Sequence, residues 1–334
     1  MRTALIIVTA LVLSILAGCE RPVEQKEGIE GLKEGKEVLT VDFQEGRSLR
    51  YRFITSKDIA LDWDPTKSRS KPGQDSTDKS SESMDMVVTY TPIEIDPYGL
   101  TTIKATCESV QVKRTGRSTR AAKRDAVEHL PKKSFTLTLN ASGKIEDYSN
   151  LDELISQIGE KAFRQSTRGG RIKEPDMISD FIATQRFLWD SISSIEKPAD
   201  GVSVGQSWSS QLLVPTPMVM QQARDVTYTL DEIRETEKGR LAVIKSSYSI
   251  AKSPPRGWPM PYSGNFKMAG TFGFFRGYPV LGLEGQGEEL FNMDAGRIEQ
   301  YNQQYEVRFN AILPGPMGTP QITISQKITM QLIK

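Results

Sequence analysis

The sequence predicts an α+β fold that is predominantly β: a large, twisted antiparallel sheet, curved as an open half-barrel or clam, with two mid-chain helices packed on one face. Two observations predict the sheet. Apolar and polar residues alternate with period two along most of the chain, and short turn signals separate the alternating segments. A third observation predicts the helices, because two mid-chain segments repeat their apolar residues with helical spacing.

Eight segments carry the alternation that gives a strand one buried face and one face toward water. They are 49–55, 84–95, 100–112, 135–139, 226–230, 241–250, 298–309 and 322–333. The turns between them, such as 96–99 and 237–239, are too short to hold the crossover helices of a parallel sheet, so consecutive strands should form a meander. Within 100–112 the buried positions change from odd to even, and a bulge near Glu108 and Ser109 would reconcile them.

The two helices are predicted over 149–162 and 175–196. Ser149 and Asn150 can cap the first helix, and Pro175 suits the first turn of the second helix, which Pro198 ends. Each helix carries one apolar stripe that must be buried against the sheet. We therefore predict one β-rich domain over 38–334, whose halves 38–148 and 208–334 are joined by these helices.

Two segments are predicted to be loops. Residues 66–83 are rich in Ser, Lys, Asp and Gly and contain no large apolar residue, so we expect a disordered loop. The proline-rich segment 253–261 is expected to be extended. Its Trp258 and Met260 are candidates for a partner contact, and the alternative is that the segment covers a sheet edge.

The start of the chain has the pattern of a lipoprotein signal peptide over residues 1–18. One positive charge precedes the apolar run 4–16, which is too short to span a bilayer. The run ends in Leu16-Ala17-Gly18-Cys19, which resembles the lipobox of bacterial lipoproteins, so Cys19 is the predicted site of lipidation. Two or three acyl chains hold a protein at a membrane almost permanently.

The segment 19–37 follows with mixed charges and three glycines, and we expect a flexible tether that holds the domain roughly 25 Å from the lipid. The predicted location is the cell envelope, lipid-anchored to a membrane. Glu20 at the second mature position favours the periplasmic side of the outer membrane in a cell that has one.

The overall charge balance argues against nucleic acid as a partner. The formal net charge of +1 gives no global field that recruits a polyanion. A local basic patch is nevertheless a candidate site for anionic lipid or an envelope polymer, and the alternative is a solvated loop. No aromatic residue interleaves with the patch to stack bases. Its members are Lys113, Arg114, Arg117, Arg120, Lys123 and Arg124.

The residues that usually carry catalysis or metal binding are scarce. His129 is the only histidine, and Cys107 is the only cysteine besides Cys19. These residues cannot make a zinc site of the usual ligands, so we expect no metal and no cofactor. Cys107 shares a strand face with Ile103 and Ala105, which indicates an inert buried thiol.

Other motifs of catalytic type are incomplete. The segment 205–209, Gly-Gln-Ser-Trp-Ser, lacks the second glycine of a nucleophile elbow. The glycines of 282–287 lack the spacing of a phosphate cradle. Three acidic pairs fit solvated strand ends, although distant carboxylates could still meet in the fold and leave a glycosidase open. The pairs are Asp62 with Asp64, Glu94 with Asp96, and Glu288 with Glu289.

Three segments, 46–53, 140–154 and 197–208, resemble a family of uncharacterised bacterial envelope lipoproteins, a domain of unknown function. In that family a Pro-x-x-x-Val-x-x-Gly-x-x-Trp-like segment follows a helix and opens a second run of strands, as Pro198 to Trp208 does here. Gln206 departs from the acidic residue expected in the segment. The resemblance implies an envelope location and this architecture, but no activity. Trp208 is predicted to anchor the core where the chain re-enters the sheet.

The predicted architecture is similar in outline to periplasmic lipid-carrier proteins. We therefore expect a non-catalytic protein that binds an apolar or amphipathic ligand such as lipid. The alternatives are a structural or protein-interaction lipoprotein and, third, an envelope polymer hydrolase. A lined apolar cavity would favour the carrier. A sheet face filled tightly by helix residues would favour the interaction protein, and those residues are Phe181, Leu188, Trp189 and Ile192.

Overall fold

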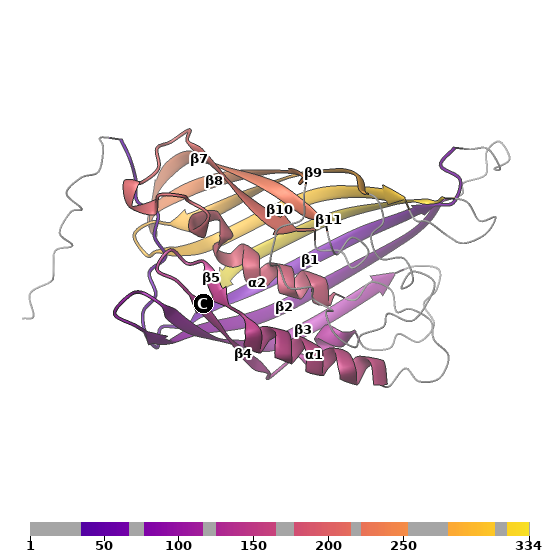
Figure 1. The fold of residues 1–334 in the computed structure, drawn as a ribbon, viewed down its shortest axis with the longest axis horizontal. Helices are drawn as coiled ribbons and strands as arrows, with labels where there is room; N and C mark the ends of the chain where they lie inside the picture. Colours follow the sequence, from indigo (N-terminus) through magenta and orange to yellow (C-terminus); the bar gives the residue numbers. More distant parts are fainter. Residues whose placement is uncertain are drawn as a thin grey trace, which may run out of the picture.

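The structure is a computed structural model that describes residues 35–66, 77–115, 125–164, 177–214, 222–252, 280–310 and 319–333. Within these residues, eleven strands form one antiparallel sheet with the order β5-β4-β3-β2-β1-β11-β10-β9-β8-β7-β6 (Figure 1). The sheet is open, because its edge strands β5 and β6 do not pair with each other. The predicted α+β fold with a large curved antiparallel sheet is confirmed.

The elements fall into two runs of strands separated by two helices. The first run is β1 (Leu49–Asp62), β2 (Thr77–Ile95), β3 (Thr101–Thr115), β4 (Ser134–Leu139) and β5 (Ile145–Asp147), with the short helix η1 (Ala126–His129) between β3 and β4. The helices are α1 (Ser149–Arg164) and α2 (Ile178–Ser193), followed by the short helix η2 (Pro198–Asp200). The second run is β6 (Ser207–Leu213), β7 (Ala223–Thr236), β8 (Gly239–Ile250), β9 (Val280–Asn292), β10 (Arg297–Asn310) and β11 (Gln321–Ile333).

The path of the chain explains why two separate runs of strands make a single sheet. The chain starts in the middle with β1, steps outward to the edge strand β5, and crosses through α1 and α2 to the opposite edge. It then steps inward from β6 until β11 pairs with β1, from Arg50 opposite Ile333 to Asp62 opposite Gln321. The first and last strands therefore lie side by side at the centre of the sheet.

Several local predictions can be compared with the strands. The register between β2 and β3 shifts at Glu108, so the predicted bulge is confirmed. The prediction of a loop over residues 66–83 was wrong in part, because β2 begins at Thr77 and its polar first residues pair with the end of β1. The sequence alternation did not reveal β9, whose three glycines interrupt the apolar pattern.

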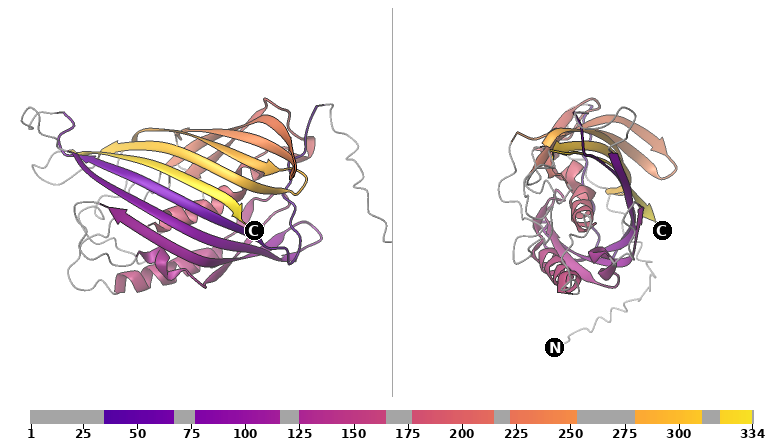
Figure 2. Two further views of the ribbon diagram at one scale, coloured as in Figure 1. Left: turned by 180° about the vertical axis from the view of Figure 1, so that it is seen from behind. Right: turned by 90° about the vertical axis from the view of Figure 1, so that its right-hand side faces the viewer.

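Helix α2 lies inside the curve of the sheet, which surrounds it on several sides (Figure 2). Phe181, Leu188 and Ile192 are buried, as expected of its apolar stripe. The prediction of a single stripe was incomplete, because polar residues on other faces of α2, including Asp180 and Gln185, are also fully buried. The helix ends at Ser193, three residues before the predicted end. A central helix enclosed by a curved sheet must place its polar side chains in the protein interior.

Helix α1 occupies the outer part of the same side of the sheet, where it packs against β4 and η1. Its apolar residues Leu151, Leu154, Ile155 and Ile158 are buried in the common core. Among the described residues, neither helix has both the length and the apolar character that a membrane span requires.

Candidate functional site

The concave face of the sheet carries a transverse row of polar side chains, which we call the polar belt. Its members occupy one register level, because each is the direct cross-strand partner of the next. On one side an apolar row that includes Leu283, Val307 and Ile324 flanks it, whereas the row on the other side also contains the buried polar residues Ser246, Gln303 and Thr55. A continuous polar row across a buried sheet face is unusual, since each group must find a partner inside the protein. The members, from β8 to β3, are Tyr248, Gly285, Tyr305, Gln326, Lys57, Glu82 and Arg114.

The basic residues of the belt form ion pairs with acids from the neighbouring helices and strands. The Lys57 ammonium lies 2.7 Å from the carboxylate of Asp180 on α2, and both side chains are almost fully buried. The Gln326 amide also donates to Asp180, at 2.8 Å. Arg114 contacts Glu82 and Asp125, the residue that caps η1. These pairs bind α2 and η1 to the sheet, and each of the two cations contacts at least one acid.

One further cation lies next to the belt and has no such acid. Arg224 on β7 is 0% exposed, and three aromatic rings surround its guanidinium. The guanidinium carbon lies 4.8 Å from the ring centre of Phe187 on α2, 4.6 Å from that of Tyr248 and 5.0 Å from that of Tyr305. On β9, between the strands of these two tyrosines, the register position is Gly285, so no side chain separates their rings. Together these residues form an aromatic cage around a positive charge.

The hydrogen-bonding capacity of Arg224 is mostly unused. Its Nη2 donates to Oε1 of Gln303 over a long 3.4 Å, whereas Nε and Nη1 have no partner. The Nε2 of Gln303 is likewise buried without a partner. Within the described part of the chain, no carboxylate lies at ion-pair distance from Arg224. A guanidinium has five N–H donors and carries its charge at every physiological pH, so this site has an unmatched positive charge and free donors.

The acids closest to the cage are engaged elsewhere. Asp190 on α2 accepts hydrogen bonds from the hydroxyls of Tyr228 at 2.6 Å and Ser210 at 2.9 Å. Both carboxyl oxygens of Glu289 lie 2.7 Å from the hydroxyl of Ser191. Burial raises the pKa of Glu289 to about 8, so at neutral pH this group is mostly protonated and uncharged. Neither acid forms an ion pair with Arg224, although the charge of Arg224 acts on Asp190 through space and partly opposes the rise in the pKa of Asp190 that burial causes.

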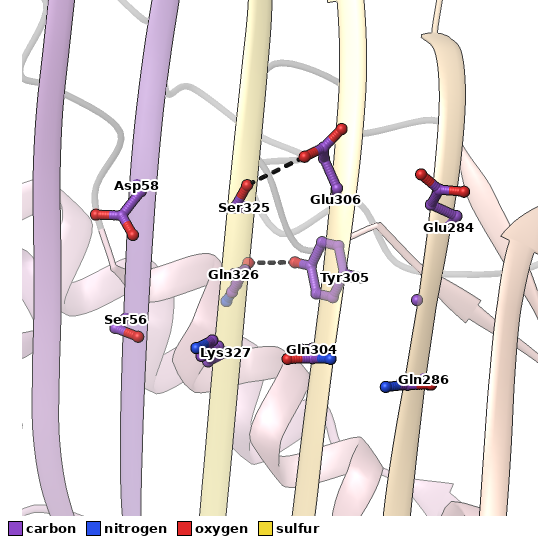
Figure 3. Close-up of a pocket in the computed structure, with 11 residues that line it drawn as sticks. Ser56, Asp58, Glu284, Gln286, Gln304, Tyr305, Glu306, Ser325, Gln326 and Lys327 are labelled. Carbon is purple, nitrogen blue, oxygen red and sulfur yellow. Dashed lines mark hydrogen bonds between the residues drawn. The ribbon is translucent and has the colours of Figure 1, made fainter.

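The convex face of the sheet has a different chemistry. A shallow groove of about 560 Å³ crosses β1, β11, β10 and β9, and its outward side chains are hydroxyls, amides, carboxylates and the ammonium of Lys327 (Figure 3). Glu284 and Glu306 face each other directly across two strands, and Asp58 lies in the same row. Figure 3 shows Tyr305 and Gln326 pointing to the other side of the sheet, where they hydrogen-bond to each other. In the described ranges no cluster of three or more potential metal ligands occurs.

The predicted basic patch is only partly visible. Arg114 points inward and is held by Glu82 and Asp125, so it is not part of an external anion site. Lys113 is exposed on the opposite face of β3. The other four members, Arg117, Arg120, Lys123 and Arg124, lie outside the described residues. The patch as a whole stays a prediction.

Some of the remaining predicted residues lie outside the described residues, and the others can be compared with the structure. Cys19, Trp258 and Met260 lie outside the described residues. Cys107 is buried, as expected, and burial raises the pKa of its thiol to about 12. Trp208 packs on the ring of Tyr228 and donates to the backbone carbonyl of Ser191 at 2.6 Å, which fits the predicted anchoring role.

Sequence reasoning missed Arg224, although a signal was present. Arg224 has the same parity as Val226, Tyr228 and Leu230, and the buried face of β7 therefore includes it. The predicted strand began at 226, three residues after the start of β7 at Ala223, so the arginine was not assigned to a buried face. A single arginine in phase with an apolar strand face is the pattern that could have revealed the cage.

The fold and the site define a class: an open antiparallel half-barrel filled by a central helix, with an interior cation that forms no ion pair among the described residues. The chain belongs to a family of unknown function (DUF6263), whose sequence profile matches residues 81–272. The matched region includes both helices, strands β2 to β8 except the start of β2, and Arg224.

Comparisons with individual proteins add little. No curated protein matches the sequence. Among solved structures, one of lipovitellin, concerned with its lipid–protein interactions, has a TM-score of 0.47 and 10% identity. It covers 88% of this chain and 26% of that chain, so this chain spans about a quarter of the length of lipovitellin. DynF from the dynemicin pathway of Micromonospora chersina has a TM-score of 0.19 and 10% identity, covering 93% and 92% of the two chains.

Proposed function

We propose that this protein is a lipid-anchored, non-catalytic lipoprotein of the bacterial envelope that binds an amphipathic ligand inside its curved sheet. The anchor is Cys19, at the end of the lipobox-like segment, and the ligand carries an acidic head group on an apolar body. The sequence of residues 16–19 and the preceding apolar run support the anchor. The chemistry of the concave face supports the ligand.

The observation that carries the proposal is the unmatched charge of Arg224. Burying an ion costs several kcal/mol even after the protein relaxes, and buried charges are normally paired for this reason. A carboxylate or phosphate at the cage would satisfy the free Nε and Nη1 donors in the bidentate geometry that arginine favours. The free amide nitrogen of Gln303 would supply another donor. The one apolar row beside the belt, with Leu283, Val307 and Ile324, would cover the hydrocarbon body of the same ligand.

Access to the cage depends on α2. Phe187 of this helix forms one wall of the cage, and Arg224 is fully enclosed while the helix is in place. The ligand therefore enters when α2 shifts away from the sheet. At the start of α2, the backbone N–H of Met177 donates to the carboxylate of Asp125 at 3.3 Å, and the buried ion pair of Asp180 with Lys57 holds the first turn of the helix against β1. We propose that α2 fills the ligand site when no ligand is bound.

Two measurements test the proposal on the full-length protein purified from membranes. Native mass spectrometry should detect a co-purifying lipid. Binding of a long-chain fatty acid should exceed binding of the alcohol of the same chain length, and Arg224→Gln should remove the difference. Arg234→Gln is the matched control, because Arg234 lies on the same strand and is exposed. Absence of any bound lipid, together with equal and negligible binding of both probes, would reject the carrier function.

A second candidate function is favoured by one observation. Phe181, Leu188, Trp189 and Ile192 are all buried, so in the present conformation α2 fills the concave face tightly. Such filling favours a structural or interaction lipoprotein, in which α2 is a permanent part of the core. The same experiments separate the two, since a permanent core takes up neither lipid nor fatty acid. The hydrolase stays a prediction with no assigned site.

A further inference from the structure

The hairpin that joins β2 to β3 ends in a group of exposed apolar side chains, which we call the apolar tip. Tyr98 is 90% exposed, and Ile93, Ile95 and Leu100 are 46%, 37% and 41% exposed. All four lie within eight consecutive positions on one hairpin. Scattered apolar residues on a surface need no explanation, whereas a contiguous group on a protruding turn marks a contact surface.

The apolar tip is held in a defined shape. The carboxylate of Asp96 accepts hydrogen bonds from the backbone N–H of Tyr98 at 2.8 Å and of Leu100 at 2.7 Å. The backbone N–H of Asp96 donates to the carbonyl of Leu100 at 2.9 Å. Gly99, at a φ of +87°, sits so close to Ala141 of the next turn that a side chain there would lie 2.8 Å from its Cβ. These contacts present the apolar side chains outward at little conformational cost on binding.

The position of the apolar tip relative to the N-terminal segment points to its partner. Just before β1, the backbone N–H of Gly46 donates to the carbonyl of Pro92, and the hydroxyls of Ser48 and Thr91 lie 2.6 Å apart. The residues just before β1 therefore pass beside this hairpin, toward the left of Figure 1, after the N-terminal segment has first joined the domain where Glu37 pairs with Val202. Eighteen residues separate Cys19 from Glu37, the first residue paired to the domain, and they can span at most roughly 60 Å.

We propose that the apolar tip docks into the surface of the same bilayer that holds the acyl chains of Cys19. The inference rests on the proposed anchoring, and it adds a second, non-covalent contact that orients the domain. A tyrosine with neighbouring aliphatic residues suits the interface, where the ring lies at head-group level and the aliphatic side chains reach the hydrocarbon. The charged residue between the exposed isoleucines is Glu94, whose negative charge does not attract anionic lipid. The proposed contact is therefore made by the apolar side chains and does not depend on anionic lipid.

Site-directed spin labelling of the lipidated full-length protein in phosphatidylcholine vesicles tests this inference. A nitroxide is attached at Tyr98→Cys or, as the control, at Trp63→Cys. Trp63 is 40% exposed and lies beyond the far end of β1, about 45 Å from Leu49. Cys19 is blocked by its acyl chains, and Cys107 is buried with a pKa raised to about 12, so the introduced cysteine is the reactive one.

The result expected is a ratio of oxygen to aqueous nickel accessibility that is several-fold higher at residue 98 than at residue 63. Leu100→Ser should lower the ratio at residue 98, whereas Leu281→Ser, a 50% exposed leucine near the Trp63 end, should leave it unchanged. Equal aqueous accessibility at both labels would overturn the inference. Shielding of residue 98 in native membranes but not in pure lipid would also overturn it and would assign the tip to a protein partner.

Failure of the anchor and failure of docking are separable. The intact mass of the same preparation reports acylation of Cys19 directly. An acylated protein with a water-exposed residue 98 contradicts docking and leaves the anchor standing. If Cys19 is not acylated, flotation of the full chain with added vesicles decides docking alone, and loss of flotation in Tyr98→Ser supports it.

Discussion

Replacing Arg224 by methionine separates a binding residue from a structural one, because the expected stability change is small. The cost of burying the guanidinium, several kcal/mol, is offset in the native state by three ring contacts of about 0.5–2 kcal/mol each. The 3.4 Å hydrogen bond to Gln303 adds about 1 kcal/mol at most. These terms nearly cancel, and methionine keeps much of the apolar volume. We therefore expect Arg224→Met to lower the free energy of unfolding by no more than about 1 kcal/mol, or to raise it.

The matched comparison is Lys57→Met at the other buried cation of the concave face. This change leaves the Asp180 carboxylate buried without its partner, which should cost about 3–5 kcal/mol. Urea denaturation followed by tryptophan fluorescence measures both variants, and Trp189 reports directly because it is buried on α2. If Arg224→Met loses as much stability as Lys57→Met, Arg224 is a structural residue and the reasoning that makes it a ligand site is refuted.

Three further predictions follow from contacts around the cage. The folded-state pKa of Glu289 is raised from 4.5 to about 8, so the free energy of unfolding should fall as pH rises from about 4.5 to 8, by up to about 1.4 kcal/mol per pH unit. Glu289→Gln should remove that slope. If the pH profiles of the variant and the unaltered protein are parallel, the assignment is contradicted. Gly287→Ala should lower the free energy of unfolding by about 1–3 kcal/mol, because the new Cβ would lie 2.8 Å from the Tyr248 hydroxyl. Thermal unfolding measures this change, and an unchanged Tm would show that the Tyr248 side chain moves aside at no cost. Trp208→Phe should cost about 1 kcal/mol through loss of the bond to the Ser191 carbonyl, and a neutral result in urea would remove the anchoring role.

The parts of the fold that could be predicted are those whose pattern lies within one continuous segment of the sequence. Alternation over 84–95 or 298–309 is a property of each strand alone, because one buried and one wet face require period two wherever the strand lies. The bulge at Glu108 was readable for the same reason, since a change of parity within one strand shows in its own residues. Turns of two to four residues then fixed antiparallel neighbours.

The errors arose where pairing, and not composition, decides the structure. Residues Thr77–Ser83 have no apolar side chain, yet they form strand because β1 pairs with all of them and β3 pairs with Ser81–Ser83. Strand β9 contains Gly282, Gly285 and Gly287, which weaken any local strand preference, and it is held by β8 and β10. In both cases the neighbours come from elsewhere in the chain, so the segment itself carries no sufficient signal.

The candidate site was still less accessible to sequence reasoning. Arg224, Phe187, Tyr248 and Tyr305 come from four separate elements, and their convergence depends on the order in which β7 to β10 lie in the sheet. Whether Arg224 has an acidic partner among the described residues depends on all the side chains around it, and no local pattern of the sequence contains that information.

By itself, the sequence determined the class of the fold, the strands with clear alternation, the two helices and the predicted export and lipidation signal, because each of these is written in neighbouring residues. Only the tertiary structure decided that the sheet surrounds α2 on several sides, that Arg224 forms no ion pair among the described residues, and that the apolar tip lies beside the residues that precede β1. The burial of a side chain and the pairing of its charge depend on residues that are distant in the sequence. These residues come together only when the sheet curves.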